Sequence, residues 1–179
     1  MIETFRLHQL LRETVSAPYR CLVTRPTGAA IRTRIEDRLA VSACITALLD
    51  FAEVEIIDFS CADEVVAKLV LGQGDGSGRF VVLRGLGEHQ IEAVEHVLNH
   101  RRLAVMAVSD EPEAPSVLGC ADPDARLAFG SVCEGPADEG ALAARLGWAR
   151  ERAARALESL AELRLARRIG GSFHPVPVR

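Results

Sequence analysis

Gly147 separates two stretches of regularly spaced apolar residues, and this arrangement constrains the fold more strongly than any other feature of the chain. The apolar residues recur at intervals of three and four, so they share one face in each of two successive helices. They are Leu142, Leu146, Ala153, Ala156, Leu157, Leu160 and Leu163. Glycine adopts a left-handed turn without strain, so the chain can reverse sharply at Gly147, with Trp148 as an apolar plug. The spacing therefore predicts a helix-turn-helix.

The flanking residues extend this unit to a winged helix-turn-helix. Asp138 is a favourable first residue for the first helix of the pair, and the second helix is expected to run to about Arg164. Upstream, Asp122 followed by a proline predicts a further helix. Downstream, a glycine pair within residues 167–173 predicts a two-stranded wing. Three helices and a wing form the predicted C-terminal domain.

The preceding part of the chain alternates between short apolar runs and amphipathic segments. Strands are expected at 19–24, 44–51, 79–83, 103–108 and, as a short edge strand, 117–118; helices are expected at 28–39, 60–71 and 88–99. This alternation implies a mainly parallel sheet with right-handed crossovers. The spacing of Leu7, Leu10 and Leu11 predicts a separate opening helix from Glu3 to Val15. The predicted fold class is therefore α/β, divided into an N-terminal helix (1–18), an α/β domain (19–120) and a small winged-helix domain (121–179).

The run LLDFAEVEIIDFSCADEVVAKL, Leu48 to Leu69, resembles the STAS family, the sulphate-transporter and anti-sigma-factor-antagonist domain. The resemblance extends over roughly residues 19–108 and rests on this motif and on the order of strands and helices. It implies a STAS-like domain in which a partner kinase phosphorylates a serine at the turn, and the phosphate switches partner binding. Aligning Asp58 with the acidic residue of the motif places that serine at Phe59. Ser60 is the nearest hydroxyl and is therefore the candidate phospho-switch.

The spacing of Ser60 and Asp63 also allows a purely structural role. A serine followed three residues later by an acid is typical of a helix start, where the hydroxyl caps a backbone N–H. The acid complements the positive end of the helix dipole. The favoured interpretation is this cap. A phosphate on Ser60 is the alternative, because a helix N-terminus also stabilises a phosphate.

The segment from Thr24 to Gly28 leaves a predicted strand and opens a predicted helix. Its backbone amides, together with Arg25, Thr27 and Gly28, form a candidate anion-binding loop, although a structural turn is the favoured interpretation. A glycine-rich stretch, Gly72 to Gly78, follows a helix and precedes a strand. A dinucleotide loop has the opposite order, so a simple connection is expected there.

Four potential metal ligands fall on one face of the helix predicted at 88–99. They are His89, Glu92, His96 and His100. A straight helix presents only neighbouring pairs to one ion, whereas zinc requires three or four ligands. The favoured interpretation is a solvated face, and we expect neither a metal site nor a cofactor.

Charge divides unevenly along the chain. Residues 135–179 carry eight arginines and five acidic residues, whereas residues 1–134 carry 13 basic and 20 acidic residues. A basic tail suits contact with a polyanion, because arginine neutralises phosphates. The candidate DNA-binding residues are Arg150, Glu151, Arg152 and Arg155 on the second helix of the pair and Arg167 and Arg168 in the wing. Pairing of these arginines with glutamates on a solvated face is the alternative.

These observations favour regulation over catalysis. No nucleophile with a base and no carboxylate pair is recognisable, and the five cysteines form no metal or disulfide pattern. The chain shows no membrane-spanning run and no signal-peptide pattern, so a cytoplasmic location is expected. The leading hypothesis is a dimeric bacterial transcriptional regulator with a STAS-like sensing domain and a winged helix that binds double-stranded DNA. The alternatives are an adaptor that binds only proteins, such as a switch kinase, and an enzyme that uses the Arg25 loop on a phosphorylated small molecule.

Overall fold

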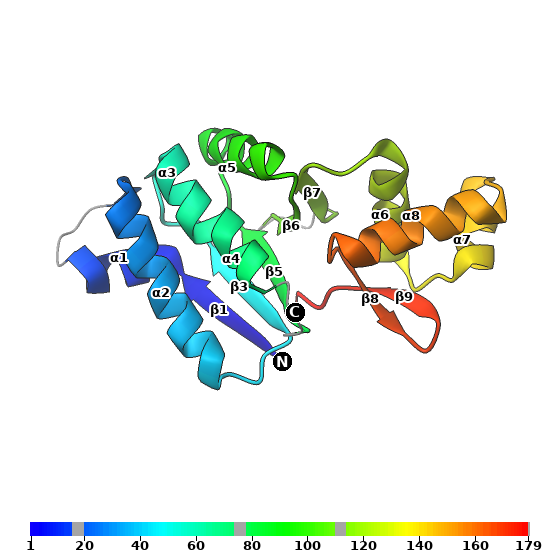
Figure 1. The fold of residues 1–179 in the computed structure, drawn as a ribbon, viewed down its shortest axis with the longest axis horizontal. Coiled ribbons are helices and arrows are strands. Elements are labelled where there is room, and N and C mark those ends of the chain that lie inside the picture. Colours follow the sequence, from blue (N-terminus) through cyan, green and yellow to red (C-terminus); the bar gives the residue numbers. More distant parts are fainter. Residues whose placement is uncertain (16–19, 74–77, 110–113, 179) are drawn as a thin grey trace.

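A five-stranded sheet forms the centre of the computed structural model, which describes residues 1–15, 20–73, 78–109 and 114–178 (Figure 1). The strand order is β1-β3-β5-β6-β7. The strands are β1 (Ile2–Arg6), β3 (Thr46–Asp50), β5 (Phe80–Arg84), β6 (Ala104–Val108) and β7 (Ser116–Gly119). The first four are parallel, and β7 is antiparallel to β6. The predicted mainly parallel sheet and its short edge strand are therefore confirmed.

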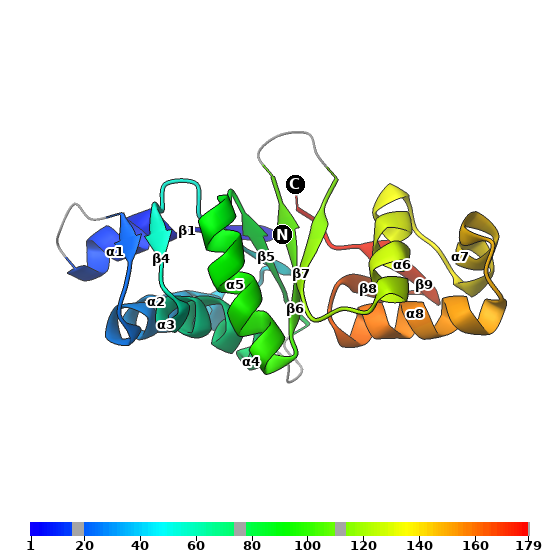
Figure 2. The ribbon, with the colours of Figure 1, turned by 90° about the horizontal axis from the view of Figure 1, so that it is seen from above.

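The helices that connect the parallel strands share one face of the sheet (Figure 2). They are α1 (Leu7–Val15), α2 (Arg25–Val41), the continuous run α3 (Phe59–Ala62), η1 (Asp63–Ala67) and α4 (Lys68–Gly72), and α5 (Glu88–Arg101). Parallel strands laid down in chain order with crossovers of one hand place every helix on the same side. One core results, in which Leu49 and Leu83 of the sheet pack with Ile31 and Val94 of the helices. None of the helices in the described segments is long and apolar enough to cross a membrane.

The opposite face of the sheet shares its core with the C-terminal unit, residues 122–178. Leu48, Val82 and Met106 point away from the connecting helices and are at most 2 % exposed. They belong to the same apolar cluster as Phe129 and Leu157 of the C-terminal unit. The chain end reinforces this packing, because the Thr46 hydroxyl donates a hydrogen bond of 2.9 Å to the carbonyl of Pro177. The sheet is thus buried on both sides, as a parallel sheet requires.

The C-terminal unit contains the predicted helices and hairpin. They are α6 (Pro123–Glu134), α7 (Glu139–Leu146), α8 (Arg150–Glu162), β8 (Ala166–Ile169) and β9 (Ser172–Pro175). Asp138 caps α7 by accepting the N–H of Ala141 at 2.8 Å, and Gly147 ends the helix with a φ of 66°. Both predictions are confirmed. One contact was not predicted: Ala137 pairs with Phe173 through two backbone hydrogen bonds, which adds a third short strand position beside the hairpin.

The N-terminal segment differs from the prediction. A helix was expected from Glu3, but residues up to Arg6 form strand β1, and α1 begins only at Leu7. The helical spacing of the leucines starts at Leu7 and says nothing of the preceding residues, which instead pair in parallel with β3. The predicted N-terminal helix over 1–18 is therefore wrong in its first part, where residues 2–6 supply an edge strand of the sheet, and its last residues, 16–18, lie outside the described residues.

The strand predicted at 19–24 is not part of the central sheet. Cys21–Leu22 forms β2, which pairs only with β4 (Ile56–Ile57) in a separate two-stranded ribbon. Its neighbours extend the ribbon, because the carbonyl of Leu22 accepts the N–H of Asp58 at 3.0 Å. This ribbon brings the start of α2 beside the start of α3.

Candidate functional site

Two of the predicted site residues, Arg25 and Ser60, line the same surface hollow. The hollow has a volume of about 400 Å³ and lies between the start of α2, the start of α3 and the last turns of α5. We call it the Arg25 hollow. Its lining residues are Arg25, Phe59, Ser60, Asp63, His96, Val97, His100 and Arg101. Residues that are far apart in the sequence therefore meet at one surface.

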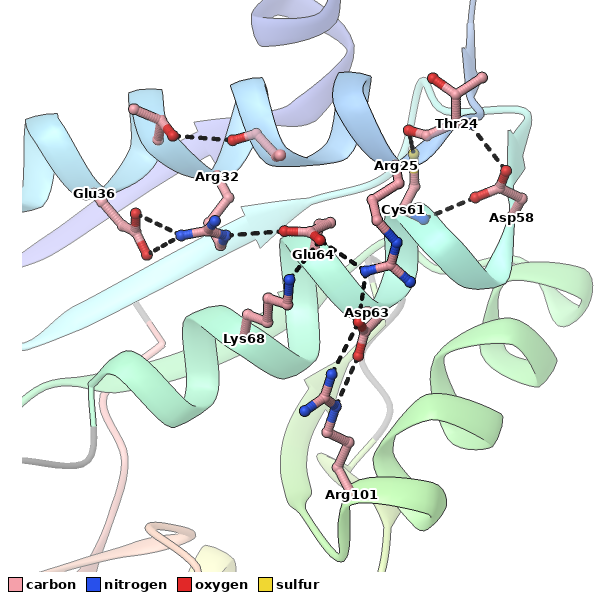
Figure 3. Close-up of polar contacts among 12 residues, drawn as sticks. Thr24, Arg25, Arg32, Glu36, Asp58, Cys61, Asp63, Glu64, Lys68 and Arg101 are labelled. Carbon is pink, nitrogen blue, oxygen red and sulfur yellow. Dashed lines mark hydrogen bonds and ion pairs between the residues drawn. The ribbon is translucent and has the colours of Figure 1, made fainter.

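Asp58 joins the two helix starts behind this hollow (Figure 3). Its carboxylate accepts the N–H of Thr24 at 2.9 Å and the N–H of Cys61 at 2.7 Å. It also accepts the hydroxyl of Ser60 at 2.8 Å. Burial alone would raise the pKa of Asp58, but these hydrogen bonds outweigh it and lower the pKa. Asp58, rather than the predicted Ser60, is the helix cap, because it directly precedes α3 and has two oxygens to offer.

The predicted anion-binding loop already binds a carboxylate of the protein, that of Asp58. The amide of Thr24 binds Asp58, while the hydroxyls of Thr24 and Thr27 lie 3.1 Å apart. Gly28 is buried, and a Cβ at this position would lie 3.0 Å from the Cα of Cys61 and the Cβ of Glu64. Thr27 and Gly28 therefore fit the favoured structural turn. Among the three predicted residues, only Arg25 lines the hollow.

Thr24 adopts a backbone conformation that is unusual for a β-branched residue, with a φ of 75°. Three contacts fix it: besides the bond to Asp58, its carbonyl accepts the N–H of Gly28 at 3.2 Å and the thiol of Cys61 at 3.0 Å. Burial, with Asp58 nearby, raises the pKa of the Cys61 thiol to about 12. Cys61 is thus a protonated hydrogen-bond donor that supports this turn.

Asp63 binds the two arginines of the hollow. Arg25 donates to Asp63 at 3.0 Å, and Arg101 donates to both of its oxygens at 2.8 and 3.0 Å. Burial would raise the pKa of Asp63, but the hydrogen bonds from Arg101 and Arg25 outweigh it and lower the pKa. The sequence pattern indicates only a helix-dipole role for Asp63 and gives no sign of its partner Arg101, because the two residues lie 38 positions apart.

Glu64 lies on the inner side of the same network. Its side chain is only 3 % exposed and is bound by Arg25, Arg32 and Lys68 (Figure 3). Burial would raise the pKa of Glu64, but the hydrogen bonds from Lys68 and Arg25 lower it. The two adjacent carboxylates occur in the π-helical turn η1, a feature that is common at functional sites. A pair of acids at the start of an apolar helix was the available signal for this network.

An exposed aromatic ring forms another wall of the hollow. The Phe59 side chain is 53 % exposed, and its ring centroid lies 4.5 Å from that of His96 at an angle of 39°. His96 and His100 are exposed, as the predicted solvated face requires. Within the described residues, no three histidine, cysteine or acidic side chains are grouped so that they could hold a metal ion.

The outward face of α8 is mainly acidic. Its buried side consists of Ala153, Ala156, Leu157 and Leu160. The exposed residues on the opposite side are Glu151, Arg155, Glu158 and Glu162. Three carboxylates and one guanidinium therefore occupy the side of α8 opposite its buried residues, and the exposed Arg150 and Arg152 lie at the flanks of this face near the start of the helix. The whole C-terminal unit is balanced in charge, since residues 122–178 carry eight arginines and eight acidic residues.

Most arginines predicted to bind DNA have acidic partners. Arg152 binds Asp124 through two hydrogen bonds of 2.8 and 2.7 Å, and its guanidinium lies 4.3 Å from the centre of the Trp148 ring. Arg150 pairs with Glu139 at 3.2 Å.

Of the two wing arginines, one has an acidic partner. Arg168 pairs with Glu158 at 3.0 Å and lies over the ring of Phe173. Within the described residues, Arg155 and Arg167 form no ion pair. Two of the predicted DNA-binding cations are therefore without a direct ion pair in the described part of the chain, although Arg155 is close enough to Asp124 to help lower the pKa of that carboxyl.

No protein-family model matches the chain, and no curated protein or solved structure is significantly similar to it. The STAS resemblance therefore stays a prediction that rests on the motif at residues 48–69.

Proposed function

We propose that the chain is a bacterial regulatory protein that acts through protein contacts. In this proposal, a STAS-like body receives a protein partner such as a kinase or regulator, and the C-terminal unit is a winged helix with an adaptor role. The observation that carries the proposal is the acidic outward face of α8, formed by Glu151, Glu158 and Glu162 around Arg155.

The arrangement of the C-terminal unit supports its assignment as a winged helix. Helix α6 is followed by two helices that meet at Gly147 and by a hairpin that turns at two glycines. The pairing of Ala137 with Phe173 ties the segment between α6 and α7 to the hairpin. A helix-turn-helix with an attached small sheet is the composition expected of this fold.

Electrostatics favours a protein over a nucleic acid at α8. A phosphate backbone would approach three carboxylates, whose repulsion opposes the counterion release on which DNA affinity depends. Arg152 is also held by Asp124 and Trp148, so its transfer to a phosphate would break both contacts. A protein surface with basic side chains would complement this face.

DNA binding is the second candidate, and a specific observation favours it. Arg155 and Arg167 have no ion-pair partner within the described segments. The pairs of Arg150 and Arg168 are exposed, and such pairs contribute only about 0–1 kcal/mol each, so they can be exchanged for phosphate contacts. In this case the C-terminal unit would bind the phosphate backbone of duplex DNA, and the α/β body would sense a signal.

Phosphorylation of Ser60 could switch partner binding whether the C-terminal unit contacts protein or DNA. The Ser60 hydroxyl donates to Asp58, so a phosphate on this oxygen would lie beside the carboxylate that holds Thr24. Repulsion between the two anions would weaken the junction between α2 and α3, and Arg25 and Arg101 nearby would attract the phosphate.

Two measurements test the proposal together. A photoreactive amino acid in place of Glu158 should yield a discrete protein adduct in cells, whereas the same group in place of Glu134, exposed at the end of α6, should not. Mixed duplex DNA should show no mobility shift even at about 50 mM salt. A low-salt shift that is abolished by combining Arg150→Ala with Arg155→Ala would overturn the proposal in favour of DNA binding.

A further inference from the structure

The Arg25 hollow contains an exposed phenyl ring. Among the phenylalanines of the described segments, Phe59 is exposed and the others are buried or partly buried. Exposure of a phenyl group to water is unfavourable, and a planar ligand stacked on it would recover that free energy. The His96 ring, whose centroid lies 4.5 Å from that of Phe59, contacts it at the wall of the hollow. The volume of about 400 Å³ is sufficient for a molecule with a single ring.

The residues that line the same hollow include more arginines than carboxylates. Arg25 and Arg101 face it with Asp63 between them, so two guanidinium groups are balanced by one carboxylate. Glu64, which also contacts Arg25, is bound on its other side by Lys68 and by Arg32, and Arg32 is itself shared with Glu36. The surplus of arginines over carboxylates in this lining favours an anion over a neutral ligand.

Both arginines are held in place but retain free donors. Asp63 binds Arg25 through Nη1 and Arg101 through Nε and Nη2. Within the described residues, Arg101 Nη1 and the Nε and Nη2 atoms of Arg25 donate to no acceptor of the chain. Because Asp63 already restrains the guanidinium groups, an anion that binds these donors would lose little side-chain entropy.

We propose that the Arg25 hollow binds a small molecule that joins a planar ring to an anionic group. The ring stacks on Phe59 beside His96, and the anion accepts hydrogen bonds from Arg25 and Arg101. The hollow lies entirely on the α/β body, so the site does not depend on whether the C-terminal unit contacts protein or DNA.

Phenyl phosphate is a suitable probe because it combines the two features, and inorganic phosphate and phenol each carry one of them. Titration followed by NMR should show saturable shifts of the His96 and His100 ring protons. The His8, His89 and His174 ring protons should stay unchanged. We expect phenyl phosphate to bind at least about tenfold more tightly than either single-feature probe, a difference of about 1.4 kcal/mol.

Two variants test the contributions of the ring and the arginine. Phe59→Leu keeps the apolar character but removes the ring, and Arg101→Gln removes one donor group; each should weaken phenyl phosphate binding at least about fivefold. Arg34→Gln, an exposed change on α2 away from the hollow, should leave binding unchanged. Equal affinity for phenyl phosphate and inorganic phosphate, or the absence of saturable shifts at His96, would overturn the proposal even if the variants fail to fold.

Discussion

Asp58 accepts the backbone N–H of Thr24 at 2.9 Å, although the two residues lie 34 positions apart in the sequence. The same carboxylate caps α3, so one side chain fixes the starts of two helices. It also holds Thr24 in its left-handed backbone conformation. The relationship makes Asp58 the link between the ribbon β2-β4 and the Arg25 hollow.

We expect Asp58→Ala to destabilise the protein by about 2–4 kcal/mol, because it removes a helix cap and a second charge-assisted hydrogen bond. Urea unfolding measures the effect. Asp122→Ala provides a matched control, since Asp122 caps α6 through the N–H of Ala125 alone. Its cost should be about 1 kcal/mol. Equal losses would show that the bond to Thr24 contributes nothing.

Gly28→Ala should destabilise the fold by about 1–3 kcal/mol, because the new methyl group overpacks the contact between α2 and the start of α3. The nearest atom is backbone, the Cα of Cys61, which cannot rotate away. In contrast, Gly130→Ala in α6 meets no atom within 4 Å and should stabilise the protein by about 0.5–1 kcal/mol. The two changes are compared by thermal unfolding, and a stabilising Gly28→Ala would contradict the close packing.

Stability should decrease as the pH falls below about 5, because folding lowers the pKa of Asp58, Asp63 and Glu64. The unfolded chain then binds protons at a higher pH than the folded chain. The stabilisation is complete above the unfolded pKa values of about 4 and is lost as the pH falls through the lowered values. Urea midpoints between pH 7 and pH 3 should fall less steeply for Asp63→Asn than for the wild type. Identical slopes would exclude a contribution from the Asp63 pairs.

Neutralising the α8 face should create DNA affinity that the wild type lacks. The combined change Glu151→Gln, Glu158→Gln and Glu162→Gln removes three negative charges and frees Arg168 from Glu158. Mixed duplex DNA should then shift at low salt, and the shift should weaken steeply as salt increases. The control changes the same charge elsewhere, on α5, by Glu88→Gln, Glu92→Gln and Glu95→Gln. If both triple variants bind DNA equally, net charge rather than the α8 face is responsible.

Local signals predicted much of the C-terminal unit. The cap at Asp138 and the turn at Gly147 depend on a few neighbouring residues, so they could be recognised without the rest of the fold. The sheet was predicted for the same reason, because its buried strands are short apolar runs. Strand β1 was missed because Leu7, Leu10 and Leu11 supply a helical signal and residues 2–6 become a strand only through pairing with β3.

The candidate site was harder to predict because its contacts are distant in the sequence. Ser60 and Asp63 fit a capping pattern, yet the cap is Asp58 and the partner of Asp63 is Arg101. Both outcomes depend on where α5 and the ribbon β2-β4 lie after folding. The charge count of the tail likewise gave no indication that Arg152 would be tied to Asp124.

Under the proposed regulatory role, the core that the sheet shares with the C-terminal unit restricts how a signal could pass between them. A domain on a flexible tether can swing to a new position at little cost, but here such a movement would expose Leu48, Val82 and Met106 to water. Loss of that burial would cost roughly 1.5–3 kcal/mol for each side chain. Ligand binding or phosphorylation at the Arg25 hollow would therefore reach the C-terminal unit through altered packing across the sheet. It would not do so through a rigid-body rotation of that unit.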